Sequence, residues 1–412
     1  ETDPNGARIN MGAYGDSAQA SRSSLDSIYL VTPYGGAVGN EKWSGTHDLA
    51  WLPIGPGWGG GDTVSLEYTT DGSAYISIAA GLTWSDLTYP AWDTAAADDG
   101  STYQIRVSDD ADPAAVNSSS GRFIVDNTAP VNVGCLWPPD NTQGLDTDIS
   151  LTGLNAQDAL SGLHALPYYF RIDKDPSFST ADLQNSGWLS SPAWNLSGLD
   201  TRTWYYWQVK ARDAADLPNE SAFGADTDVP GSWWAFKTAA VFHVVDTQEL
   251  RDVLDTEALE PGDRIYLDAG GDFSNVTAPI TAWGTFTGTA DLPIHIEGEN
   301  GRPVISGDGL VSTLLDIQGS YFLVQGLDFT EAGGSGLTVS GNENTVNSCG
   351  AYANGSAGFE ITGDHTRIQN TFSYINGYCG ILLSGADRSE VYNNSSYDNG
   401  TYGISLAGAT RN

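Results

Sequence analysis

The stretch Leu315-Asp316-Ile317-Gln318-Gly319 opens the repeat that decides the fold of the last part of the chain. Its pattern is an apolar residue, a variable residue, a second apolar residue, another variable residue and glycine. Later copies begin at Leu337, Phe359, Ile381 and Ile404, at spacings of 22, 22, 22 and 23 residues. Two apolar residues separated by one lie on the same face of a β-strand, and the glycine permits the tight corner that follows. The period therefore predicts a solenoid in which every repeat adds one turn.

Two further columns keep the same period. One consists of the apolar residues Val324, Val346, Ile368 and Val391, and the other of the tyrosines Tyr352, Tyr374 and Tyr397. Each tyrosine is followed two residues later by an Asn-Gly pair, at Asn354, Asn376 and Asn399. Asn-Gly is a turn pair, and asparagine side chains at the same position of successive turns can hydrogen-bond to one another.

This pattern resembles the right-handed parallel β-helix of bacterial extracellular proteins, and the resemblance extends upstream. It implies a cap in which a short strand at Val244–Asp246 precedes a helix at Leu250–Leu254. Glu260–Leu267 resembles the first full strand, and Pro293–Gly298 resembles the strand of a following turn. We therefore expect residues 241–412 to form the N-terminal cap and first coils of a parallel β-helix.

The region before the repeat has the patterning of two β-sandwiches. In residues 128–240, the run Thr203–Asp213 alternates apolar and polar residues like a central strand, and Trp234–Thr238 resembles a closing strand. These runs resemble a bacterial fibronectin type III module. Residues 23–127 resemble an immunoglobulin-like module.

The first residues carry another resemblance. Asp3–Gly15 resembles the segment that closes a β-helix domain at its C-terminal end, although here it opens the chain. The expected fold is thus all-β. It consists of a β-helix-closing segment at 1–22, an immunoglobulin-like sandwich at 23–127, a fibronectin III-like sandwich at 128–240 and a right-handed parallel β-helix at 241–412.

The composition limits the classes of partner. The 412 residues include 52 Asp and Glu against 17 Lys and Arg, a formal net charge of −35. So negative a surface repels phosphate backbones and anionic lipid head groups, which argues against nucleic acid and against a polybasic membrane contact. The sequence has no apolar run of about 20 residues, so no membrane span is expected. Cys135, Cys349 and Cys379 are too widely spaced for a disulfide scaffold or a zinc cluster, and we expect buried thiols.

The order of the parts suggests a structural function at the cell surface or outside the cell. A solenoid that ends at an uncapped turn exposes unpaired backbone groups and an open apolar cross-section. Two accounts are open: the chain is a piece of a longer surface protein, or copies assemble in trans. In the second account the closing segment of one copy covers Ile404 and Leu406 of the next, and repetition of this contact gives a head-to-tail filament. The residues expected to contribute from the closing segment are Arg8, Ile9, Asn10, Met11, Gly12 and Tyr14.

The alternative is a fragment of a β-helix polysaccharide lyase or glycosidase, or of a polysaccharide-binding adhesin. The resemblance implies that such a lyase needs a base and groups that neutralise an acidic sugar. The residues that could supply them are Asp364, His365, Arg367, Asp387 and Arg388. His365 and Asp387 have the same offset in the repeat, so we expect them one strand spacing, about 5 Å, apart. A solvated corner with charge pairs explains the same residues, and we favour a non-enzymatic function.

Calcium binding and sugar stacking are two further hypotheses. We expect no catalytic cofactor, but carboxylates in loops are the ligands that Ca²⁺ prefers. The acidic clusters that could supply them are Asp98 with Asp99, Asp109 and Asp110 with Asp112, and Asp140 with Asp146 and Asp148. Trp58, Trp84 and Trp92 are expected in loops, where an exposed ring can stack on a sugar. Packing of the loop onto the sandwich is the alternative for all three.

Overall fold

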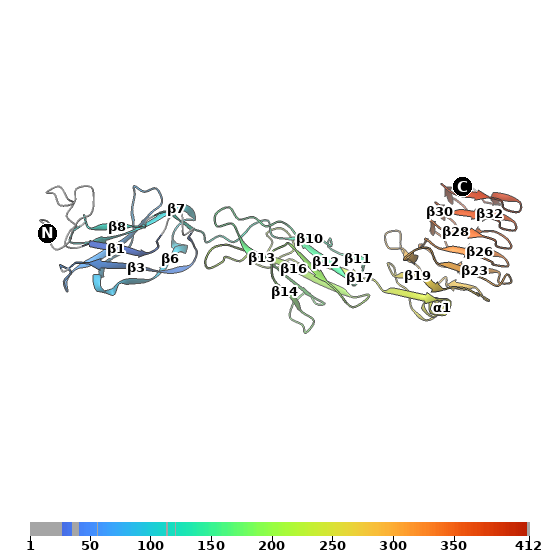
Figure 1. Cartoon of the computed structure of the whole chain (residues 1–412), viewed down its shortest axis with the longest axis horizontal. Helices are drawn as coiled ribbons and strands as arrows, with labels where there is room; N and C mark the ends of the chain where they lie inside the picture. Colours follow the sequence, from blue (N-terminus) through green and yellow to red (C-terminus); the bar gives the residue numbers. More distant parts are fainter. Residues whose placement is uncertain (1–26, 35–40, 56, 113, 120, 410–412) are drawn as a thin grey trace, which may run out of the picture.

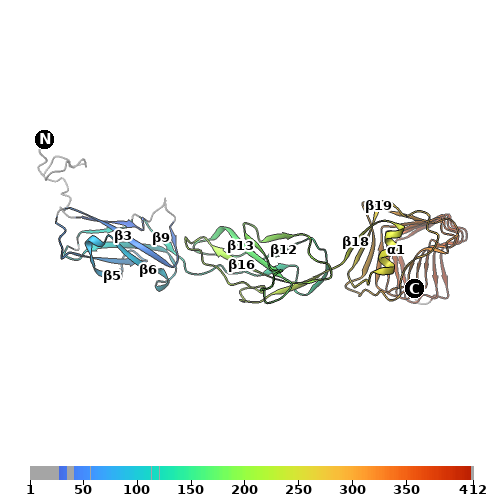
Figure 2. The same ribbon diagram turned by 90° about the horizontal axis from the view of Figure 1, so that it is seen from below.

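The computed structural model describes residues 27–34, 41–55, 57–112, 114–119 and 121–409. Figures 1 and 2 show three modules arranged end to end in an elongated rod. The first two modules are β-sandwiches and the third is a β-solenoid, which confirms the expected all-β fold class. Within these ranges no helix is both long and apolar enough to cross a membrane.

The first module packs two sheets around an aromatic core. One sheet has the strand order β1-β3-β6, and the other has the order β2-β9-β7-β4-β5 with β8 paired to β7. Alternate residues of β3 and β7 point inward, so Trp51 and Ile105 are fully buried. The strands are β1 (Ser27–Thr32), β2 (Lys42–Trp43), β3 (Thr46–Ile54), β4 (Thr63–Thr69), β5 (Ile76–Thr83), β6 (Thr88–Asp93), β7 (Gly100–Asp109), β8 (Val116–Ser118) and β9 (Phe123–Val125).

The second module is also a two-sheet sandwich. Its sheets have the strand orders β10-β12-β15 and β11-β17-β16-β13-β14. The predicted central strand is β16, whose Trp207 stacks on Phe170 of β13 with ring centroids 6.3 Å apart in the core. The strands are β10 (Cys135–Trp137), β11 (Thr142–Leu145), β12 (Ile149–Gly153), β13 (Leu163–Asp173), β14 (Gln184–Leu189), β15 (Ala193–Leu196), β16 (Trp204–Asp213) and β17 (Trp234–Thr238).

The second module continues into the solenoid with almost no linker. Only Ala239 and Ala240 separate β17 from β18 (Val241–Asp246), and both are buried. The helix α1 (Thr247–Thr256) follows at once because the Asp246 side chain accepts a hydrogen bond from Glu249 N, and Glu249 Oε2 accepts one from Val245 N. These two hydrogen bonds start the helix, whose buried Leu250 and Leu254 cover the first turns of the solenoid.

Three parallel sheets form the walls of the solenoid. Their strand orders are β18-β19-β21-β24-β27-β30-β33, β20-β23-β26-β29-β32-β35 and β22-β25-β28-β31-β34. The first sheet contains β19 (Arg264–Asp272), β21 (Ile294–Glu299), β24 (Phe322–Gln325), β27 (Thr345–Asn347), β30 (Arg367–Gln369) and β33 (Glu390–Tyr392). The second contains β20 (Ile280–Ala282), β23 (Thr313–Ile317), β26 (Ser335–Val339), β29 (Phe359–Ile361), β32 (Cys379–Ser384) and β35 (Tyr402–Ala407). The third contains β22 (Val304–Ser306), β25 (Asp328–Thr330), β28 (Gly350–Tyr352), β31 (Phe372–Tyr374) and β34 (Ser395–Tyr397).

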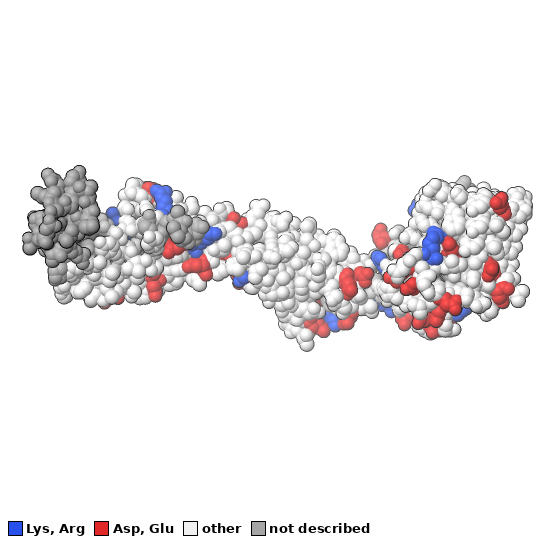
Figure 3. All heavy atoms as spheres, in the orientation of Figure 1, with Lys and Arg blue, Asp and Glu red and all other residues white. Residues whose placement is uncertain are grey.

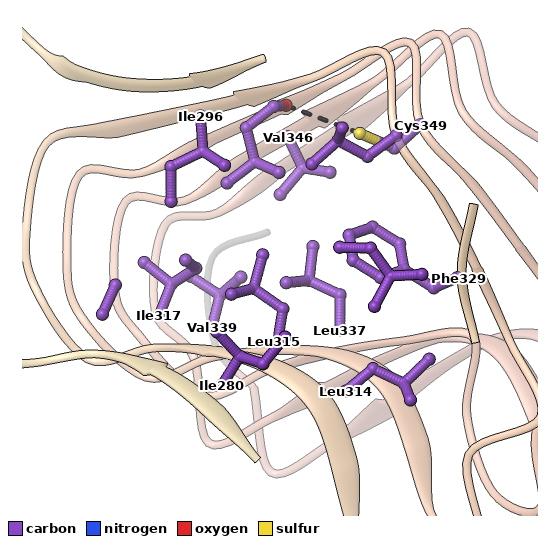
Figure 4. Close-up of a cluster of buried hydrophobic side chains, with 14 of the residues drawn as sticks. Ile280, Ile296, Leu314, Leu315, Ile317, Phe329, Leu337, Val339, Val346 and Cys349 are labelled. Atoms are coloured by element: carbon purple, nitrogen blue, oxygen red, sulfur yellow. Dashed lines mark hydrogen bonds between the residues drawn. The ribbon is translucent and has the colours of Figure 1, made fainter. Parts of the chain in front are cut away.

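The register confirms the repeat predicted from the sequence. Leu315 pairs with Leu337, and the same column continues through Phe359 and Ile381 to Ile404. Figure 4 shows Leu315 beside Leu337 in the core of the solenoid. Each turn alone could not bury this face, so the solenoid is held together by contacts between turns.

The predicted asparagine column forms a ladder inside one corner of the solenoid. Asn376 Oδ1 accepts hydrogen bonds from the backbone N–H of Asn354 at 3.1 Å and from Asn354 Nδ2 at 2.9 Å. Asn399 Oδ1 makes the equivalent contacts with Asn376 at 3.1 and 3.0 Å. On the outside, the rings of Tyr352, Tyr374 and Tyr397 stack at 5.0 and 5.2 Å. Both columns keep successive turns in register.

Charge and cysteines agree with the sequence analysis. On the face shown in Figure 3, acidic side chains are scattered over all three modules and no broad basic surface is seen. Cys135, Cys349 and Cys379 are buried free thiols, and burial raises the pKa of Cys379 to about 11.

Candidate functional site

The junction between the two sandwiches brings together three carboxylates. Asp126 follows β9 at the end of the first module, Asp158 lies in the loop after β12, and Asp213 ends β16. One oxygen of each lies within 4.8 Å of the others. Asp126 and Asp213 are only 1% and 0% exposed, and Asp158 is half-buried. In the described part of the chain, no other group of three or more His, Cys, Asp or Glu side chains converges in this way.

The hydrogen bonds that hold these carboxylates come from uncharged groups. Asp126 Oδ2 accepts one from Ser161 N at 2.9 Å, and Asp213 accepts from Asn219 N at 2.8 Å and Asn219 Nδ2 at 2.6 Å. Burial raises the pKa of Asp213 above its ordinary value of 3.8, and the charge of Asp126 acts in the same direction. Like charges so close together are stabilised by protonation or by a cation. The donor set of carboxylate oxygens fits a hard divalent cation such as Ca²⁺.

The same junction is fastened by direct contacts between the modules. His47 of β3 stacks on Trp43 at 4.3 Å, and its Nδ1 lies 3.6 Å from Asp216 Oδ2 in the second module. The backbone N–H of Asp216 donates to Lys42 O at 2.8 Å, and Ser44 Oγ donates to Leu217 O. Asp126 is therefore a buried part of the junction.

The acidic loops selected in the sequence do not form comparable clusters. Their carboxylates instead accept backbone hydrogen bonds that close turns or join loops to the sandwich. Examples are Asp109 Oδ1 with Ala111 N at 2.8 Å, Asp140 Oδ1 with Ala235 N at 2.8 Å and Asp148 Oδ1 with Gly198 N at 2.7 Å. Asp99 accepts from Asn127 N at 2.8 Å and so supports the segment next to Asp126. Calcium at the loops themselves stays a prediction.

The sequence analysis missed Asp126, Asp158 and Asp213, although one signal was available. In β16 the inward positions are Tyr205, Trp207, Val209 and Ala211, and the next inward position is Asp213. An aspartate in the buried phase of a strand is costly unless it is partnered. The other two carboxylates are far away in sequence, and only the fold brings them to Asp213.

At the corner of the solenoid, the backbone N–H of His365 donates to Asp387 O at 2.9 Å, so the two residues are neighbours as expected, although the register between their turns is shifted by one residue. Arg367 pairs with Glu390, which places His365 beside Arg388. Asp387 instead follows Asp364, whose Oδ1 accepts a hydrogen bond from Asp387 N at 2.7 Å. The reason is that this turn has 23 residues and not 22. Ile361 still pairs with Leu383, 22 residues later, but Asp364 contacts Asp387, 23 residues later, so the extra residue lies between Leu383 and Asp387.

The charged residues at this corner are mostly paired with one another. Arg367 Nε lies 2.8 Å from Glu390 Oε2, and Arg388 Nε lies 3.7 Å from Asp387 Oδ2. His365 Nδ1 lies 3.9 Å from Glu343 Oε1 of the preceding turn. Asp364 is engaged with backbone, so the five predicted catalytic candidates form charge pairs and turn contacts along one corner.

Of the three tryptophans proposed for sugar stacking, Trp92 was wrongly predicted to lie in a loop. It belongs to strand β6, not to a loop, and is only 6% exposed in the core of the first module, where a sugar cannot reach its ring face. Trp58 and Trp84 are half-buried, with ring centroids 5.8 Å apart. Trp84 Nε1 donates to Gly59 O at 2.7 Å, so this pair packs its loop onto the sandwich. Sugar stacking on Trp58 and Trp84 stays a prediction.

The two halves of the predicted assembly interface differ in what the structure describes. Arg8, Ile9, Asn10, Met11, Gly12 and Tyr14 lie outside the described residues. Ile404 and Leu406 lie on β35, the last strand of its sheet, and are 47% and 59% exposed although their counterparts Ile381 and Leu383 are fully buried. The last described turn thus presents an open apolar face.

Comparisons with known proteins agree with this architecture. Residues 315–412 match the family model described as the right handed beta helix region. No curated protein sequence matches the chain significantly. Among solved structures, an alginate lyase from Paenibacillus sp. str. FPU-7 is similar at 22% identity and a TM-score of 0.35, over 41% of this chain and 65% of that one.

Two further solved structures are similar to part of the chain. The chicken CNTN1 FN1–FN3 domains match at 15% identity and a TM-score of 0.28, over 51% of this chain and 65% of that one. Domains A168–A170 of titin match at 11% identity and a TM-score of 0.27, over 48% of this chain and 65% of that one. The chain therefore spans about 65% of the length of these structures. The C-terminal module is a right-handed parallel β-helix, and it follows two β-sandwiches.

Proposed function

We propose that this chain is an extracellular structural subunit, a rod whose modules are held in line and which joins other copies through the end of its β-helix. The observation that carries this proposal is that both module junctions are built from buried, specific contacts. Modules joined by flexible linkers need no such contacts, because relative motion is the ordinary state of neighbouring domains. A fixed rod suits a spacer or a filament.

The junction between the second sandwich and the solenoid supports the proposal. Asp263 is 1% exposed and pairs with Arg202 Nη2 at 2.8 Å across the junction. Its carboxylate also accepts hydrogen bonds from Ala240 N and Glu260 N, both at 2.8 Å. A buried carboxylate with three partners from both modules fixes their relative position.

At the junction between the sandwiches we propose a structural Ca²⁺ held by Asp126, Asp158 and Asp213. The cation would neutralise three carboxylates that now lie within 4.8 Å of one another. Because Asp126 closes the first module and the other two belong to the second, the cation would join the modules and not merely stabilise one of them. The expected effect of Ca²⁺ is a higher melting temperature and a narrower distribution of interdomain angles.

The proposed assembly uses the open face at Ile404 and Leu406. Covering both side chains with a parallel turn of another copy would continue the hydrogen-bond ladder of β35 and remove apolar surface from water. The closing segment at residues 1–22 is the proposed occupant. This contact joins different surfaces of two copies, so its repetition gives a chain of copies without a closed ring.

Sedimentation velocity of the whole chain tests the assembly. The wild type should form a series of oligomers that grows with concentration, and Leu406→Asp should shift it to monomers. Leu310→Asp is the matched control, because Leu310 is 85% exposed elsewhere on the solenoid. A monomeric wild type, or equal effects of the two variants, would contradict the assembly.

The polysaccharide lyase is supported less well. Its base and its neutralising cation would have to come from His365, Arg367 and Arg388. Arg367 and Arg388 already face Glu390 and Asp387, and His365 faces Glu343. The corner therefore offers no spare positive charge for the carboxylate of an acidic sugar.

A further inference from the structure

A preformed groove lies on the outside of the solenoid beside the His365 corner. It has a volume of about 290 Å³ and is lined by residues of three successive turns and by the loop that precedes β21. That loop forms a wall whose shape is fixed. Thr289 and Leu292 exchange backbone hydrogen bonds at 3.0 and 3.2 Å, and Ile294 N donates to Tyr321 O at 3.0 Å. A small rigid groove with a few convergent polar groups is the usual form of a ligand site.

The lining of the groove contains two chemically different kinds of residue. Pro293, Leu323 and the ring of Tyr321 supply apolar surface, and Glu343 and His365 supply hydrogen-bonding groups. A pyranose ring has the complementary form, with an apolar face of C–H groups and a rim of hydroxyls. The volume, at the lower end of the range of about 300–1,000 Å³ for ligand pockets, suits one sugar residue and its linkage rather than a long chain.

The charges decide which kind of sugar fits. Arg367 lines the groove, but its guanidinium is paired with Glu390 at 2.8 Å. Glu343 adds a carboxylate 3.9 Å from His365. An anionic sugar would therefore meet carboxylates with no unpaired guanidinium to bind it, whereas sugar hydroxyls can donate to Glu343 and accept from the imidazole.

We propose that this groove binds a neutral hexose residue of a polysaccharide, with the ring on Leu323 and Tyr321 and the hydroxyls on Glu343 and His365. The site would attach the solenoid to a glycan of a surface or matrix. It goes beyond the structural function proposed above and does not depend on it, because the groove lies on the side of the solenoid and the assembly face lies at its end.

Calorimetry with the whole chain tests the proposal. The probes are hexasaccharides of β-1,4-linked glucose, β-1,4-linked mannose and, as the anionic comparison, α-1,4-linked galacturonate. We expect saturable binding of at least one neutral hexasaccharide and none of galacturonate. Glu343→Gln should weaken binding by about 10-fold or more, the usual effect of losing a hydrogen bond to a charged group.

Two variants and one control separate the site from the fold. Leu323→Glu places a charged side chain on the apolar floor from an outward position of β24 and should abolish binding. Glu331→Gln, an exposed glutamate on another face, should bind like the wild type. Binding to none of the neutral probes, a preference for galacturonate, or wild-type affinity in both Glu343→Gln and Leu323→Glu would each overturn the proposal, and none of these results bears on oligomer formation.

Discussion

Removal of one asparagine from the ladder should weaken the solenoid without affecting the sandwiches. Asn376 is 1% exposed, and its amide makes four hydrogen bonds to neighbouring turns. Asn376→Ala leaves the N–H of Asn354 and the C=O of Ala351 without the side-chain partner that each has now. Each unsatisfied buried group costs about 1–3 kcal/mol, so the expected loss in the free energy of unfolding is about 2–5 kcal/mol.

Hydrogen exchange read by mass spectrometry localises this loss. Peptides that contain the turns around residue 376 should exchange about 30-fold or more faster, since about 1.4 kcal/mol corresponds to a factor of ten. Urea unfolding followed by tryptophan fluorescence reports mainly on the sandwiches, because only Trp283 of the 13 tryptophans lies in the solenoid. That transition should keep its midpoint.

The control for this prediction is Asn393→Ala, which removes an exposed outer amide that donates to Asn370 Oδ1. A solvated hydrogen bond is replaced by water, so the change should stay within about 0.5 kcal/mol. Equal effects of Asn376→Ala and Asn393→Ala would refute the argument that the buried ladder holds the turns together.

Three more results are expected. Without Ca²⁺, thermal stability should fall as the pH rises from 3.8 through the raised pKa of Asp213, because the folded state then keeps a proton that the unfolded state has lost. Ca²⁺ should remove this loss of stability. A pH profile that Ca²⁺ does not change would count against the site. Arg202→Ala leaves the carboxylate of Asp263 buried without its cation and should destabilise the junction by about 3–5 kcal/mol, which calorimetry can measure. Arg202→Lys keeps the positive charge and should lose less stability. Thr366→Asn should stabilise the solenoid by about 1 kcal/mol in urea unfolding. The buried Thr366 Oγ1 has no hydrogen-bond partner, whereas Asn344, at the equivalent position of the preceding turn, bonds to the backbone of the neighbouring turn through both its amide oxygen and its amide nitrogen. A lower midpoint of unfolding would show that the asparagine amide does not fit.

The solenoid could be predicted from the sequence because residues that contact each other in successive turns are separated by one repeat length in the sequence. Leu315 and Leu337 are neighbours in space because they are one repeat apart, and no long-range information is needed. The same reasoning gave a register wrong by one residue where the period changed. The residue inserted between Leu383 and Asp387 places His365 in register with Arg388 and not with Asp387, since a spacing alone does not say where in the turn an insertion falls.

The junction site could not be predicted in this way. Asp126, Asp158 and Asp213 are separated by 32 and 55 residues, and no repeat relates them. Their meeting depends on how one sandwich docks on the other. Trp92 failed for a related reason, because a proline and small residues around it indicated a loop, whereas pairing with β3 makes it a buried strand residue.

The most direct test of the rod and its assembly is electron microscopy of the whole chain beside a version that lacks residues 1–15. The account predicts straight rods of the whole chain joined end to end into unbranched threads, and single rods of the shortened version. Single particles from both, or particles in which the three modules take many relative angles, would contradict it.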